Sequence, residues 1–155
     1  PNLSMNLENL EVNNIYADSL PLEQKVKFNC VQNQSGGYYH FTTNLFSGLD
    51  KNPFIAEQRI SDIEYGYLQD FILVGVFSIP DGYVFEAVPE NISLTIEDKS
   101  IVFSRFMTLS ENQLNVRMSV EFRNSYYPVD RYSNFREFYK KLFEALNEQV
   151  IIKKK

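Results

Sequence analysis

The sequence predicts a mainly β protein, an antiparallel β-sandwich of about seven to nine strands with one C-terminal α-helix followed by a short final strand. Apolar and polar residues alternate in several segments, and turn residues separate these segments at intervals of roughly ten residues. Apolar residues recur at helical spacing in a single stretch near the C-terminus. The length of 155 residues fits one domain, so we expect residues 1–155 to form a single accessory-sized β domain.

The strands are predicted from the alternation of side chains. Residues 114–122 are apolar at every second position and polar between, as expected for a strand with one buried face. The same pattern predicts strands at residues 26–30 and 92–96. Residues 71–79 are apolar on both faces, so we place this strand in the middle of a sheet, covered by the helix and by a second sheet.

The helix is predicted over residues 132–149, with residues 150–152 returning to strand. Asp130 or Ser133 is expected to cap its N-terminus. Before it, residues 45–67 read as a long irregular connection with a short strand near residues 58–63. Steps of three or four give the helix one stripe: Tyr132, Phe135, Phe138, Leu142, Ala145, Leu146 and Gln149.

Charge and hydropathy exclude several classes of function. The net charge is −5, which repels phosphate backbones and anionic lipids, so we expect no nucleic-acid partner and no polybasic membrane docking. No apolar run approaches the roughly 20 residues that a membrane-spanning helix needs. The chain starts without an initiator Met, which suggests the C-terminal part of a longer or processed protein.

The residues do not form a recognisable catalytic set. A cysteine nucleophile needs a lowered pKa and a histidine partner, and the chain offers only Cys30 and His40. Cys30 alternates with Val26 and Phe28, which predicts packing in the core, and His40 reads as a surface or half-buried strand residue. One His and one Cys cannot supply a tetrahedral zinc site. We therefore expect no catalytic, cofactor-binding or metal-binding residue, and no enzyme activity in this chain.

Two other groups of residues are candidates for ligand contact. Asp62 and Glu64 are neighbouring acids without the spacing of a calcium loop, and such acids are usually solvated surface. Tyrosines near strand ends could contact a glycan or a peptide, although packing within the protein or between domains is the alternative, and the chain has no Trp. The possible contact residues are Tyr38, Tyr65, Tyr67, Tyr126 and Tyr127.

A family resemblance is carried by the order and spacing of four segments: Asn52-Pro53-Phe54, Ile79-Pro80-Asp81-Gly82-Tyr83, Val88-Pro89-Glu90, and residues 132–154. This arrangement resembles the C-terminal domain of unknown function that closes bacterial transglutaminase-like proteins. The resemblance covers residues 52 to the end, whereas residues 1–51 fit by position only, as the preceding β region.

The resemblance implies a role and a partner. In that family a transglutaminase-like, papain-like core precedes this domain, carries the catalytic residues and is exported to the periplasm or cell surface. No position here matches the catalytic motif. The implied function is a noncatalytic accessory domain that packs against or positions the upstream core of the same polypeptide. A glycan- or peptide-binding module that uses the exposed tyrosines is the alternative.

Overall fold

The computed structural model describes residues 4–31 and 34–155. It is mainly β, with antiparallel strand pairs, one α-helix near the C-terminus and a final strand after that helix, which confirms the predicted fold class. The chain divides into two compact units, residues 1–40 and 41–155, which are described separately. The grouping of all 155 residues into a single domain stays a prediction.

The first unit is built on a hairpin of β1 (Ser4–Asn13) and β2 (Glu23–Val31), which contains the strand predicted at residues 26–30. Leu7 pairs with Phe28 and Leu10 pairs with Val26, because the register shifts by a bulge between Leu7 and Asn9. The bulge thereby keeps the apolar residues of both halves of β1 on one face. A short turn follows between β3 (Gln34–Ser35) and β4 (Tyr38–Thr42).

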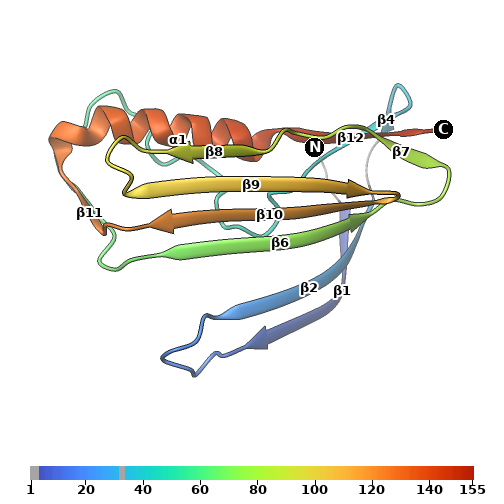
Figure 1. Ribbon diagram of the computed structural model, residues 1–155, viewed down its shortest axis with the longest axis horizontal. Coiled ribbons are helices and arrows are strands. Elements are labelled where there is room, and N and C mark those ends of the chain that lie inside the picture. Colours follow the sequence, from blue (N-terminus) through green and yellow to red (C-terminus); the bar gives the residue numbers. More distant parts are fainter. Residues whose placement is uncertain (1–3, 32–33) are drawn as a thin grey trace. The chain divides into compact units, whose positions relative to one another are not determined.

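The second unit contains a four-stranded sheet in the order β6-β10-β9-β8 (Figure 1). Its strands are β6 (Asp70–Ser78), β8 (Ile92–Thr95), β9 (Ile101–Ser110) and β10 (Gln113–Phe122). The strands predicted at residues 92–96 and 114–122 are therefore confirmed. The inner face of the sheet is the core, and its buried apolar residues are Ile101, Phe103, Met107, Leu114, Val116, Met118 and Val120.

The prediction that residues 71–79 lie in the middle of a sheet is wrong. Among the described residues, β6 is hydrogen-bonded to β10 and lies at the edge of its sheet. Its outward side chains Ile72, Val74 and Val76 are 58%, 68% and 60% exposed. The run is apolar on both faces although only its inner face meets the core of the second unit.

The helix α1 (Tyr132–Asn147) is preceded by the 3-10 turn η1 (Val129–Arg131) and followed by β12 (Gln149–Lys154). The helix ends two residues earlier than predicted because Glu148 is extended and Gln149 begins β12. β12 pairs with β7 (Tyr83–Ala87), which confirms the predicted final strand (Figure 1). The predicted caps are wrong: Arg131 is the N-cap and no side chain caps the helix, since η1 leads the chain into it.

Two features hold the long connection before β6. The aromatic side chain of Phe54 packs against α1, and the short strand β5 (Ile63–Glu64) of the connection pairs with β11 (Tyr126–Tyr127). The strand β5 lies slightly after the predicted position of residues 58–63. Phe54 is 8% exposed, and its ring lies 4.6 Å from the rings of both Phe135 and Tyr139. The Tyr132 hydroxyl donates to the Ala56 carbonyl at 2.9 Å. These contacts fix the connection over the helix.

Candidate functional site

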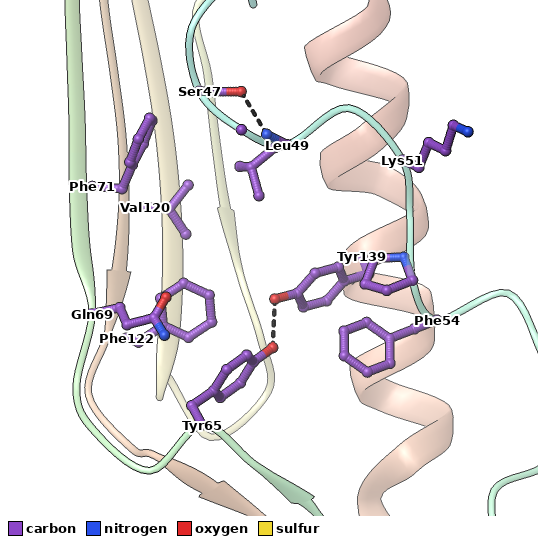
Figure 2. Close-up of a pocket in the computed structure, with 12 residues that line it drawn as sticks. Ser47, Leu49, Lys51, Phe54, Tyr65, Gln69, Phe71, Val120, Phe122 and Tyr139 are labelled. Atoms are coloured by element: carbon purple, nitrogen blue, oxygen red, sulfur yellow. Dashed lines mark hydrogen bonds between the residues drawn. The ribbon is translucent and has the colours of Figure 1, made fainter.

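A cavity of about 380 Å³ lies in the second unit, between α1, the sheet and the long connection (Figure 2). Phe71, Val120 and Phe122 line it from the sheet, and Tyr139 lines it from α1. The connection supplies the remaining wall, with Ser47, Gly48, Leu49, Lys51, Pro53, Phe54, Tyr65 and Gln69. The lining is therefore mostly apolar and aromatic.

Two phenol groups face each other at this cavity. The hydroxyls of Tyr65 and Tyr139 are 2.7 Å apart and share a hydrogen bond (Figure 2). Tyr139 is 4% exposed, and burial raises its pKa, with a further rise from the neighbouring Tyr65. Tyr65 is half-buried, and burial raises its pKa as well. Both phenols are neutral at physiological pH, so the pair is a hydrogen-bonding group without charge.

The β5–β11 pair places Tyr65 at this position. The Tyr65 amide donates to the Ser125 carbonyl at 2.8 Å, which continues the ladder by one bond. Its ring then packs edge-on against Phe122, with ring centroids 5.2 Å apart. Sequence reasoning missed Tyr139, although its position four residues after Phe135 puts it on the buried side of the helix.

A buried arginine joins the helix C-terminus to the sheet. Arg105 is 2% exposed and donates to the carbonyls of Ala145 and Glu90, at 2.5 and 2.8 Å. It also pairs with the half-exposed carboxylate of Glu148 at 2.5 Å. A cation suits the last turn of a helix, where carbonyls lack intrahelical partners. Arg105 lies two residues from both Phe103 and Met107 on β9, so the alternation of a strand places it on their apolar side. The sequence analysis missed this signal.

The structure places the two candidate reactive residues in strands of the first unit. Cys30 is a free, half-buried thiol on β2, and burial raises its pKa, which keeps it protonated. Cys30 is therefore more exposed than the core packing predicted from the sequence would make it. His40 is half-buried on β4. Across residues 4–31 and 34–155, the structure contains no group of three or more His, Cys, Asp or Glu side chains that could hold a metal ion.

The five candidate tyrosines do not share one environment. Tyr67 and Tyr126 are 68% and 51% exposed, whereas Tyr127 is 3% exposed and donates to the Asn124 carbonyl at 3.0 Å. The rings of Tyr65 and Tyr127 lie 6.2 Å apart, edge to face, inside the second unit. Tyr38 is 40% exposed on β4 in the first unit. A binding role for these residues stays a prediction, and Tyr127 is too buried to offer a ring face to a ligand.

Asp62 has a local structural role. Its carboxylate accepts hydrogen bonds from the Tyr126 hydroxyl at 2.7 Å and from the Val129 amide at 2.8 Å, which fixes the turn before α1. These two bonds hold its pKa below the usual 3.8. A carboxyl group whose pKa is lowered by folding stabilises the folded state at pH values above the pKa of the unfolded chain. This stabilisation is lost as the pH falls through the pKa of the folded state.

We therefore expect Asp62→Asn to lower stability at neutral pH, and the difference to shrink as the pH falls into the acid range, where the native carboxylate becomes protonated too. Urea unfolding midpoints measured across this range would show the two curves converging. Tyr126→Phe removes one of the two bonds and should give part of the effect. Parallel curves at all pH values would contradict this account.

The match to a family of proteins covers most of the second unit. The family model described as a domain of unknown function with a solved structure, DUF3858, matches residues 36–152. The chain belongs to the DUF3858 family. The DUF3858 region starts close to the division between the two units and includes α1, the cavity and Arg105. The predicted assignment to a domain of unknown function is thereby confirmed, and the transglutaminase-like parent stays a prediction.

A solved structure shares the DUF3858 fold of this chain. It is the crystal structure of a proposed protease from Parabacteroides distasonis ATCC 8503, with a TM-score of 0.62 and 14% sequence identity. The similarity covers 76% of this chain and 24% of that protein. No curated protein matches the chain in sequence. Within the described residues, no helix has the length and apolar character that crossing a membrane requires.

Proposed function

We propose that this chain is a noncatalytic accessory domain that packs against a catalytic core of the same polypeptide. The observation that carries the proposal is the outer face of the sheet in the second unit. Ile72, Val74 and Val76 on β6 and Phe106 on β9 all leave more than half of their surface exposed. Large apolar side chains gathered on one exposed face of a protein mark a contact site.

The register brings these side chains together on one face. Val74 pairs with Arg117 of β10, and Arg117 pairs with Phe106 of β9, so the three lie in one row across the sheet. The Arg117 side chain is exposed and separates two apolar groups. A surface with apolar groups around a central Arg is typical of protein interfaces. We call Ile72, Val74, Val76, Phe106 and Arg117 the outer-face patch.

Two considerations indicate what kind of core would cover the outer-face patch. The fold makes up a quarter of a longer protein that is described as a proposed protease. The segment order of this sequence also resembles the domain that follows a transglutaminase-like, papain-like core. We infer a core of that class, upstream in the same polypeptide and exported to the periplasm or cell surface. The protonated Cys30 thiol fits a chain that leaves the chemistry to this core.

The test compares one substitution in two proteins, the full polypeptide encoded by the gene and the 155-residue chain. In the full polypeptide we expect Val74→Lys to lower stability by about 2 kcal/mol, because it removes the burial of a Val side chain and desolvates a charge. In the shorter chain the side chain is exposed, so the change should be smaller, within about 1 kcal/mol. Calorimetry of both proteins measures the difference.

Gln149→Lys, at an exposed position of β12, adds the same charge away from the outer-face patch and serves as the control. It should change both proteins equally. Equal effects of Val74→Lys in the two proteins would contradict docking through this face. A gene that encodes no upstream catalytic core, or a purified 155-residue chain that cleaves or crosslinks a peptide, would contradict the accessory role itself.

A further inference from the structure

The phenol pair at the cavity has a hydrogen-bond donor to spare. Two tyrosine hydroxyls carry two hydrogens, and the Tyr65–Tyr139 bond uses one of them, whichever group donates. Among the described residues, the structure records no second hydrogen bond for either hydroxyl. The spare hydrogen is free to bond an acceptor that reaches the pair. The cavity is where such an acceptor would be placed (Figure 2).

The lining determines the charge of a suitable occupant. Lys51 is the charged residue of the lining, but it is exposed, and its side chain extends away from the phenol pair in Figure 2. An anion placed against the phenols would therefore lose its hydration without gaining a cation. A cation would meet no carboxylate, because the lining contains none. An uncharged occupant meets neither cost.

The volume and the walls determine its size and polarity. About 380 Å³ falls within the range of roughly 300–1,000 Å³ that small-molecule sites occupy. Val120, Phe71 and Leu49 present aliphatic and aromatic surface to the space, and the phenol pair forms one border of it (Figure 2). We propose that this cavity binds an uncharged, mainly apolar small molecule whose carbonyl oxygen accepts the spare phenol hydrogen.

The test uses two probes of nearly equal shape. Acetophenone carries a carbonyl group where α-methylstyrene carries a C=CH2 group. NMR titration of the 155-residue chain with each probe should shift the methyl signals of Leu49 and Val120. The double variant Tyr65→Phe/Tyr139→Phe removes every phenol donor, and replacing both partners of a hydrogen bond by apolar groups of the same shape is nearly neutral for stability. It should therefore fold and still bind α-methylstyrene.

The expected result is a change in selectivity. In the double variant, the affinity for acetophenone relative to α-methylstyrene should fall by roughly 2- to 12-fold, the contribution of one hydrogen bond. Tyr126→Phe, which removes an exposed phenol that bonds Asp62, should leave the ratio unchanged. An unchanged ratio in the double variant would overturn the role of the spare hydrogen. Probe-induced shifts that avoid Leu49 and Val120 would overturn the cavity as the site.

Discussion

Arg105→Met is expected to lower the free energy of unfolding by about 3 kcal/mol, because the Glu90 carbonyl loses its bond from Arg105 and the Ala145 carbonyl keeps only the 3.3 Å bond from the Glu148 amide, and each lost bond to a charged donor costs roughly 1.5–3 kcal/mol. Met has a similar length and fills most of the vacated space, so the loss reports on hydrogen bonding more than on packing. Glu148 is half-exposed and regains water when the cation is removed. Equilibrium urea unfolding followed by circular dichroism measures the change.

Arg117→Met provides the matched control. Arg117 pairs with Phe106 on the opposite, outer face of the same sheet and is exposed, so its loss should change stability by no more than about 0.5 kcal/mol. Glu148→Gln should have an intermediate effect, since it keeps both carbonyl contacts of Arg105. If Arg105→Met were as stable as the native chain, the two carbonyls would have to be hydrated, and the link between helix and sheet would lie elsewhere.

Phe135→Ala is the second large effect that we expect, a loss of about 4 kcal/mol. Phe135 is completely buried on α1. Its ring centroid lies 4.6 Å from that of Phe54, 4.9 Å from Tyr127 and 4.7 Å from Tyr139. The ring therefore joins the long connection, β11 and the helix, and its removal leaves a cavity at the point where three elements meet.

Urea unfolding again measures the loss, and Phe106→Ala is the control. Phe106 is 55% exposed on the outer face, so truncating it in the 155-residue chain removes little buried surface. A loss below about 1 kcal/mol for Phe135→Ala would mean that the surrounding rings collapse into the space. In that case the aromatic cluster could not be the feature that holds the connection over the helix.

Regular alternation and helical spacing were sufficient to predict β2, β8, β10 and α1, because each of these elements has one face that is more buried than the other. The edge position of β6 was not predictable in the same way. Apolar residues on both faces of a strand indicate that both faces suit an apolar environment. They do not indicate whether the strand has a neighbour at each of its edges. The start of the helix at residue 132 was predicted correctly, but its capping residues were not, since η1 replaces a side-chain cap.

The candidate site was less predictable than the fold. Tyr65 was singled out as a possible ligand contact, but its hydroxyl partner Tyr139 is 74 residues away in the chain. The β5–β11 pair that positions Tyr65 is two residues long on each strand and has no periodicity to detect. The register of Arg105, between the buried Phe103 and Met107, was a local signal of its burial, but the carbonyls to which it donates lie on other elements and could not be predicted from local spacing.

The bulge in β1 changes how related hairpins can be recognised. The apolar positions of β1 are odd-numbered up to Leu7 and even-numbered from Leu10, and the strand continues through the switch. A search that demands strict two-residue periodicity would divide this segment into two fragments, each too short to score as a strand. An aligned relative with one residue fewer at this point could keep the same hairpin with an unbroken ladder, so a gap there is compatible with a shared structure.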